Sequence, residues 1–183
     1  MANAVDLTGL FSERFFKNFL PIPATNQFPL GIFAPPFELC HIQTRQWVRL
    51  SDYTAVHPVV LAFTRIFTER HYCPLCYPHI KAMNQAYEQF RQRGVEVLMI
   101  SSTDALQSQI VIQDLGITMP FLSDPTCQVF RLYEVGQALG APLPAQFIVD
   151  RSGRLRFRHL FSFLEPNASV ERLLSALDTI DSL

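Results

Sequence analysis

Two continuous apolar runs constrain the fold of this chain more than any other feature. Residues 58–63 (PVVLAF) and 95–100 (VEVLMI) are rich in aliphatic and β-branched side chains, and the two runs together contain one charged residue, Glu96. Strands that alternate polar and apolar residues bury one face, whereas uninterrupted apolar strands are buried on both faces, as in parallel sheets covered by helices. We therefore expect two central strands with helices packed on the sheet.

The segment between these runs has helical periodicity. Ile80, Met83, Tyr87 and Phe90 fall on one face of a helix that ends near Gly94. The other predicted elements are a hairpin over 37–42 and 47–50, a helix over 104–115 closed by Gly116, a strand over 119–124, a helix over 125–136, strands over 145–150 and 155–161, and a helix over 170–180. This order is typical of an α/β fold with a right-handed parallel crossover.

The first 30 residues have a different character. Their apolar side chains follow one helical stripe, which consists of Leu7, Leu10, Phe11, Phe15 and Phe19. The stripe predicts an amphipathic helix that docks on the domain or on a second subunit, with membrane-surface binding as the alternative. Prolines then mark an extended linker. We therefore divide the chain into residues 1–30, a helix with a proline-rich linker, and residues 31–183, one folded domain.

Composition excludes several classes of function. The chain has 183 residues, a formal net charge of -1 and scattered basic residues, so nucleic acid is not an expected partner. Charged residues interrupt the apolar N-terminus, as they would not in a signal peptide, and no run reaches the roughly 18 apolar residues of a membrane helix. Four cysteines are too few for a secreted disulfide framework. We therefore expect a cytoplasmic protein with no membrane partner.

The segment 70–80, RHYCPLCYPHI, carries the chemistry. It places Cys73 and Cys76 directly after a core strand, at the edge of an α/β sheet where ligands and reactive groups gather. If a helix begins near Pro74, the two α-carbons lie within about 5 to 6 Å, which suits a disulfide. The helix dipole would then favour thiolate over thiol. A helix that begins at Pro78 is the alternative.

Other interpretations of the same segment stay open. His71, Cys73, Cys76 and His79 match the ligand count of four-coordinate zinc or copper, and Arg70 and the histidines would otherwise add positive charge near the thiols. Four ligands within nine residues would have to converge on one turn, so redox chemistry is the favoured hypothesis. A catalytically inactive binding or scaffold protein is the remaining alternative. We expect no cofactor.

A proline before a predicted strand marks a second candidate position. A cis peptide bond at Pro144 is the favoured interpretation, and it would expose the backbone of Leu143 to an extended substrate facing the cysteines. An ordinary proline in the turn before a strand is the alternative. The two other cysteines, Cys40 and Cys127, are predicted to be packing residues.

Seven segments, in the same order, resemble the thioredoxin-fold superfamily and within it the peroxiredoxin-like AhpC/TSA branch. They are APPFEL, VRLSDY, PVVLAFTR followed by CPLC, GVEVLMISSTD, FLSDP, LYEVG and FIVDRSGRL. The resemblance implies a thioredoxin-like fold, with a central mixed sheet flanked by helices, and a thiol-dependent oxidoreductase acting through Cys73 and Cys76 in antioxidant or redox homeostasis. It implies a hydroperoxide or disulfide substrate and a thiol reductant such as thioredoxin or glutathione, and it leaves a homodimer open.

The chain departs from the peroxiredoxin pattern at the peroxide-binding positions. In that family a threonine or serine precedes the peroxidatic cysteine by three residues, and an arginine on a later strand helps to bind peroxide. Cys73 takes the threonine position if Cys76 is peroxidatic, with Cys73 then resolving; Arg70 takes it if Cys73 is peroxidatic. The departures favour thioredoxin-like exchange, in which Cys73 attacks and Cys76 resolves. The candidate substrate-binding residues are Thr68, Arg70, Leu143 and Pro144.

Overall fold

The computed structural model describes residues 9–25 and 27–180. Its helices are α1 (Glu13–Lys17), α2 (Leu50–Thr54), α3 (Tyr77–Gln85), α4 (Tyr87–Gln92), α5 (Ala105–Leu115), α6 (Gln128–Leu132) and α7 (Val170–Ile180). Its strands are β1 (Glu38–His41), β2 (Gln46–Arg49), β3 (Val59–Thr64), β4 (Ile66–Thr68), β5 (His71–Tyr72), β6 (Glu96–Ser101), β7 (Phe121–Ser123), β8 (Gln137–Ala138), β9 (Ala141–Pro142), β10 (Ala145–Val149) and β11 (Leu155–Leu160).

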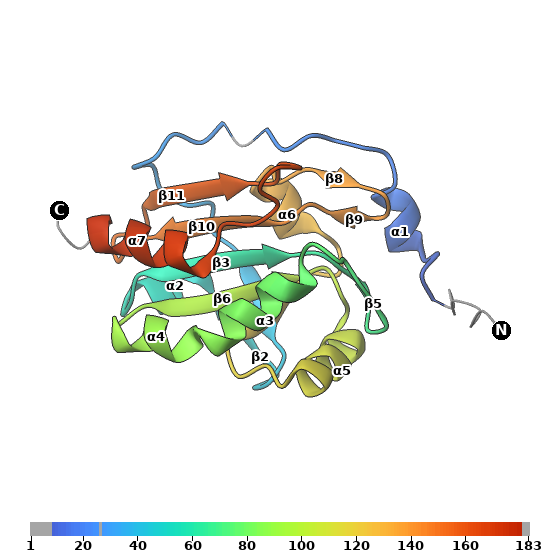
Figure 1. The fold of residues 1–183 in the computed structure, drawn as a ribbon, viewed down its shortest axis with the longest axis horizontal. Helices are drawn as coiled ribbons and strands as arrows, with labels where there is room; N and C mark the ends of the chain where they lie inside the picture. The colour runs from blue at the N-terminus through green and yellow to red at the C-terminus, as the bar shows by residue number, and fades with distance from the viewer. Residues whose placement is uncertain (1–8, 26, 181–183) are drawn as a thin grey trace.

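A seven-stranded sheet forms the centre of the molecule, in the order β11-β10-β3-β6-β7-β1-β2 (Figure 1). The pairs β3–β6 and β6–β7 are parallel, and the other pairs are antiparallel. The predicted mixed α/β sheet is therefore confirmed, and so is the predicted β1–β2 hairpin. Thr64 pairs with Ser101 at the ends of β3 and β6, so both strands finish at the same edge of the sheet.

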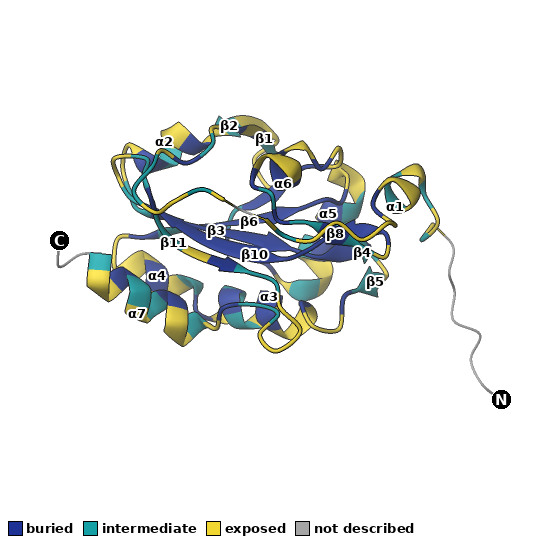
Figure 2. Ribbon diagram, turned by 90° about the horizontal axis from the view of Figure 1, so that it is seen from above, coloured by how far each residue is buried: buried dark blue, intermediate teal, exposed yellow. Residues whose placement is uncertain are grey.

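Helices cover both faces of this sheet (Figure 2). Side chains alternate along β3: Val60 and Ala62 join the core under α3, α4, α5 and α7, whereas Leu61 and Phe63 join the core under α2 and α6. All six residues of β3 are buried. The uninterrupted apolar run was the sequence signal for this double coverage, and the structure confirms it.

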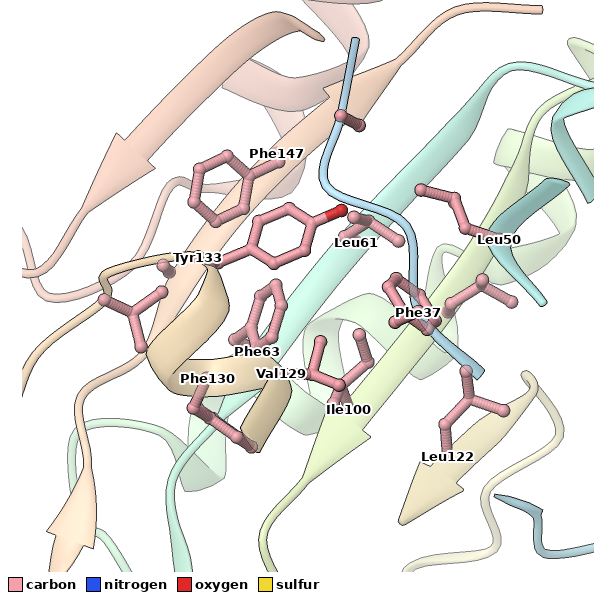
Figure 3. Close-up of a cluster of buried hydrophobic side chains, with 14 of the residues drawn as sticks. Phe37, Leu50, Leu61, Phe63, Ile100, Leu122, Val129, Phe130, Tyr133 and Phe147 are labelled. Carbon is pink, nitrogen blue, oxygen red and sulfur yellow. The ribbon is translucent and has the colours of Figure 1, made fainter. Parts of the chain in front are cut away.

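An aromatic cluster fills the core on the α6 side (Figure 3). The ring of Phe63 lies 5.1 Å from Phe130, 5.1 Å from Tyr133 and 5.8 Å from Phe147, measured between centroids. Edge-to-face and tilted contacts at these distances are favourable for aromatic pairs. The buried Tyr133 hydroxyl donates to the Pro35 carbonyl at 2.9 Å. The cluster fixes α6 against the middle of the sheet.

Helix α5 ends where the sequence predicts. Asp104 caps its N-terminus by accepting from the Gln107 N–H at 2.8 Å, and Gly116 ends it with a left-handed backbone at φ 59°. The helix predicted over 125–136 is shorter and spans only α6. The helix predicted to end near Gly94 is divided at Ala86 into α3 and α4.

The N-terminal helix is much shorter than its apolar stripe suggested. Only α1 is helical, and Leu7 lies outside the described residues. The chain then runs along the β8–β9 hairpin, where Ile22 and Gln137 exchange backbone hydrogen bonds of 2.8 Å. The segment therefore docks on the domain, while the division at residue 30 stays a prediction. Over the described part of the chain, no helix is long and apolar enough to cross a membrane.

Candidate active site

The CPLC segment lies between a small hairpin and a helix at the edge where β3 ends. After Thr64 the chain forms the β4–β5 hairpin, and Cys73 follows directly. The Cys73 carbonyl accepts hydrogen bonds from the Cys76 N–H at 3.0 Å and the Tyr77 N–H at 2.9 Å. Residues 73–76 therefore form a closed turn that leads into α3.

Helix α3 begins at Tyr77, so the prediction of a start near Pro74 is wrong and the alternative start at Pro78 is within one residue. Cys76 is the N-cap residue, and Pro78 lies in the first turn. The N–H groups of that turn have no partner within the helix, so the missing N–H of proline costs no hydrogen bond there. Pro78 therefore does not interrupt the helix.

The two cysteine sulfurs have opposite electrostatic surroundings. The pKa of Cys73 is lowered to about 6, chiefly because the Cys76 thiol donates a hydrogen bond to it, with further help from the N–H groups of Leu75 and Cys76 and from the charge of Arg65. The pKa of Cys76 is raised by the same hydrogen bond and by burial. Cys73 is 6% exposed and Cys76 is fully buried, and all four cysteines are free thiols. These surroundings favour the thiolate at Cys73, with the Cys76 thiol as its hydrogen-bond donor.

Arg65 is a site residue that the sequence interpretation did not select. It follows β3 directly, is 8% exposed, and donates to the carbonyls of Ala138 and Leu139 in the turn between β8 and β9. Its positive charge favours the thiolate form of both Cys73 and Cys76. The signal for it was its place at the carboxyl end of the central strand, as the last residue of the quoted run PVVLAFTR.

A network of amides from the last third of the chain holds the CPLC turn. The Asn167 side chain donates to the Leu75 carbonyl at 3.2 Å and also bonds the Cys76 sulfur. Gln146, fully buried in β10, donates to Asn167 at 3.0 Å and accepts from the Ala168 N–H at 2.7 Å. Sequence analysis missed both amides, because nothing local in the sequence connects residues 146 and 167 to the cysteines.

Thr68 and Arg70 belong to the β4–β5 hairpin. The buried Thr68 hydroxyl accepts from the N–H groups of Arg70 and His71, both at 3.2 Å, and lies 2.7 Å from the His71 ring nitrogen Nδ1. The Arg70 side chain is 65% exposed and lies 3.9 Å from the Glu69 carboxylate. These contacts stabilise the hairpin turn, and a substrate role for either residue stays a prediction.

The Leu143–Pro144 bond is not cis, since the described residues contain no cis peptide bond. The predicted cis proline is therefore wrong. The Leu143 N–H is also occupied, because it donates to the Gly136 carbonyl at 3.0 Å. Ala145 pairs with Phe63, so Pro144 does lie at the edge of the sheet where β3 ends. A substrate role for Leu143 and Pro144 stays a prediction.

His79 does not supply positive charge to the thiols, which corrects one expectation. Burial lowers its pKa to about 4, and its Nε2 bonds the Ala168 carbonyl at 3.0 Å. Across the described ranges, no three His, Cys, Asp or Glu side chains gather as they would around a metal ion. The four-ligand set of His71, Cys73, Cys76 and His79 is therefore not assembled in this structure.

The other two cysteines lie elsewhere. Cys127 is 1% exposed at the start of α6, where burial raises its pKa, and Cys40 lies half-buried in β1 opposite Trp47. Both positions agree with packing.

The fold and the site together define a thiol-dependent oxidoreductase of the thioredoxin fold: a mixed sheet covered by helices, with a C-x-x-C turn before the helix that follows the central strand. The chain belongs to the AhpC/TSA family, whose model matches residues 30–158. Membership confirms the family and the oxidoreductase class predicted from the sequence, and it favours an enzyme over the inactive scaffold.

Curated relatives include both thiol-exchange and peroxidase enzymes. The thiol-disulfide oxidoreductase ResA of Geobacillus thermodenitrificans is 30% identical over 128 residues, which are 69% of this chain and 67% of the relative. Peroxiredoxin 1 of Sulfuracidifex metallicus is 28% identical over 111 residues, 56% of this chain and 51% of the relative.

Solved structures confirm the fold. A yeast mitochondrial 1-Cys peroxiredoxin has a TM-score of 0.72 at 17% identity, covering 85% of this chain and 77% of the other. The 2-Cys peroxiredoxin of Plasmodium vivax has a TM-score of 0.69 at 22% identity, covering 84% and 82%. At these identities the likeness concerns the fold alone.

Proposed function

We propose that this protein catalyses thiol–disulfide exchange, with Cys73 as the nucleophile and Cys76 as the resolving thiol. The observation that carries the proposal is the asymmetry of the pair: hydrogen-bond donors surround the Cys73 sulfur, whereas the Cys76 sulfur is completely buried. The thiolate is the attacking species in exchange, and a thiol with a pKa near the ambient pH attacks best. Cys73 has that property and is the more accessible of the two.

In the reductive direction, the Cys73 thiolate attacks one sulfur of a substrate disulfide and forms a mixed disulfide, while the other substrate sulfur leaves as a thiolate. Cys76 then loses its proton and attacks the Cys73 sulfur, which releases the second substrate thiolate. The substrate gains two electrons, and the enzyme ends with a Cys73–Cys76 disulfide. The thiol of Cys76 is placed for the second step because it already bonds the Cys73 sulfur.

Hydroperoxide reduction is the second candidate. The low pKa of Cys73 and the peroxiredoxin relatives favour it. In that reaction the Cys73 thiolate takes one peroxide oxygen and becomes sulfenic acid, an alcohol or water leaves, and Cys76 then condenses with the sulfenic acid and releases water. This order inverts the roles expected for a C-x-x-C peroxidase. The Thr68 hydroxyl is engaged inside its hairpin, which supports exchange as the primary activity.

The substrate groove and the partners belong to the same proposal. Leu143 and Pro144 would contact a substrate at the edge beside the end of β3, with Thr68 and Arg70 on the opposite hairpin. A thiol reductant such as thioredoxin or glutathione would restore the dithiol. The small number and irregular spacing of the cysteines support a reducing compartment such as the cytoplasm.

Trapping of the mixed disulfide tests the proposal. Reduced wild type, Cys73→Ser and Cys76→Ser are mixed with an aromatic disulfide at neutral pH and, separately, with hydrogen peroxide, and intact mass is followed with time. Cys76→Ser should accumulate a stable mixed disulfide on Cys73, wild type should lose two hydrogens, and Cys73→Ser should react no faster than a free thiol. Cys40→Ser is the matched control and should behave as wild type.

Each outcome has a defined meaning. Reaction with the disulfide at a rate above that of a free thiol supports exchange. A rapid reaction with peroxide alone moves the assignment to the peroxidase. A mixed disulfide that forms on Cys76 in the Cys73→Ser protein would contradict the assigned roles.

A further inference from the structure

Arg65 lies beside the cysteines, since its backbone N–H bonds the Cys76 sulfur and its charge acts on both sulfurs. A segment far away in the sequence holds its side chain in place. Its guanidinium donates to the Ala138 and Leu139 carbonyls in the β8–β9 turn and lies 4.8 Å above the ring of Phe67. Its Nε has no hydrogen-bond acceptor among the described residues, although the side chain is only 8% exposed. Arg65 is therefore fixed between the turn and Phe67 and keeps one buried donor for an anionic group.

Residues 14–25, called the arm here, hold the same turn from its other side. The N–H of Leu139 donates to the Phe19 carbonyl and the N–H of Gly140 to the Asn18 carbonyl, both at 3.0 Å. The Phe15 ring lies directly on Gly140, where an added Cβ would come within 2.0 Å of a ring carbon. Leu139 thus bonds the arm through its N–H and Arg65 through its carbonyl.

A second chain of contacts leads from the arm to Arg65. Arg14 donates to the carbonyls of Phe67 and Ser102. Phe67 is the residue whose ring lies under the Arg65 guanidinium. Figures 1 and 2 show α1 beside the β8–β9 and β4–β5 hairpins in both views. Two independent sets of contacts therefore lead from the arm to the Arg65 guanidinium, one through the β8–β9 turn and the other through Phe67.

We propose that the arm contributes to the active site. In this proposal the arm positions Arg65, and Arg65 in turn stabilises the Cys73 thiolate. Arg14, Asn18 and Phe19 are positioning residues, since they act through Arg65 and its turn. The inference rests on the proposed function only in taking Cys73 as the nucleophile. It assigns a role to a segment that lies outside the part of the chain matched by the family model.

Two substitutions in the full chain displace the arm, and each has a matched control. Gly140→Ala places a methyl group inside the Phe15 ring at a backbone φ of 90°. Gly94→Ala imposes similar left-handed strain at φ 68° with nothing within 4 Å of the new Cβ. Arg14→Ala removes the second chain of contacts. Lys17→Ala removes an exposed arm residue that pairs with Glu13 and leaves that chain intact.

The readout is the rate at which iodoacetamide alkylates reduced Cys73 between pH 5 and pH 9, measured on the Cys73 peptide. Below the pKa this rate follows the thiolate fraction. Gly140→Ala and Arg14→Ala should lower the rate at pH 5 by about threefold or more, which corresponds to a rise of roughly half a pKa unit, and leave the rate at pH 9 unchanged. Gly94→Ala and Lys17→Ala should match wild type across the range.

A double-mutant cycle separates positioning from general loosening of the structure. In an Arg65→Met background, Gly140→Ala and Arg14→Ala should have no further effect on the alkylation profile. Arm variants that keep the circular dichroism and the alkylation profile of wild type would overturn the inference, as would an effect that persists in Arg65→Met. If Gly140→Ala fails to fold, Arg14→Ala carries the test.

Alkylation needs no biological substrate, so the two proposals can fail separately. A protein without disulfide or peroxide turnover whose Cys73 profile still depends on the arm would refute the proposed function and leave this inference standing.

Discussion

The hydrogen bond from Cys76 to Cys73 supports one quantitative prediction. With its pKa at about 6, Cys73 is half ionised at pH 6. Cys76→Ala removes the largest cause of that low pKa, while the Leu75 and residue 76 N–H groups and Arg65 remain. Burial, which opposes ionisation, also remains, so we expect the pKa of Cys73 to rise by about 1.5 units, part of the way to the value of about 8.5 of a free cysteine. The thiolate fraction at pH 6 should then fall from about one half to roughly 3%.

Iodoacetamide alkylation of the reduced protein measures this change. The rate at pH 6 should fall about 15-fold in Cys76→Ala and recover at pH 9, where both proteins are ionised. Cys76→Ser keeps a hydroxyl that donates to the sulfur, so its decrease should be smaller. Cys40→Ala tests for non-specific effects of removing a cysteine and should match wild type. A pKa in Cys76→Ala within about 0.3 units of wild type would refute the reasoning, because another group would then have to hold the thiolate.

Three further predictions concern stability. The pKa of His79 is about 4 in the folded protein, below its unfolded value of about 6.5, so the unfolded chain takes up a proton first and stability falls as pH drops through that window. Urea unfolding at pH 7 and pH 4.5 should therefore show a loss of stability in wild type that exceeds the loss in His79→Gln by about 2 kcal/mol, and equal losses would contradict the assignment. Phe63→Ala should cost about 3–5 kcal/mol in urea unfolding, whereas Phe163→Ala, at a side chain 91% exposed, should cost less than about 0.5 kcal/mol. Asp104→Ala removes the N-cap of α5 and should cost about 1 kcal/mol by the same measurement, while a neutral result would mean that the cap is not needed.

The elements that the sequence predicted well have local signals. The apolar runs in β3 and β6 identified strands buried on both faces, and Asp104 and Gly116 marked both ends of α5. The C-x-x-C spacing and its position after a core strand identified the candidate site. Each of these features depends on a few neighbouring residues and on one kind of periodicity.

The predictions that failed depend on partners distant in the sequence. The start of α3 is set by the turn that closes on the Cys73 carbonyl, and the trans Leu143–Pro144 segment is tied to Gly136 through the β8–β9 hairpin. Both β4–β5 and β8–β9 are short hairpins without a strong strand pattern. Propensity and periodicity do not report such contacts, because their stability comes from packing against the rest of the domain.

The sequence by itself determined the α/β class, the order of the long central strands and helices, the family, and the two cysteines of the candidate site. Only the tertiary structure shows which sulfur the surroundings favour as the thiolate, because that depends on directed hydrogen bonds and on the burial of Cys76. It also brings Arg65 and Asn167 to the two cysteines and places the arm on the β8–β9 turn. These groups come from opposite ends of the chain and meet only when the sheet has formed, and electrostatic effects on a thiol act over a few ångströms of space and not along the chain.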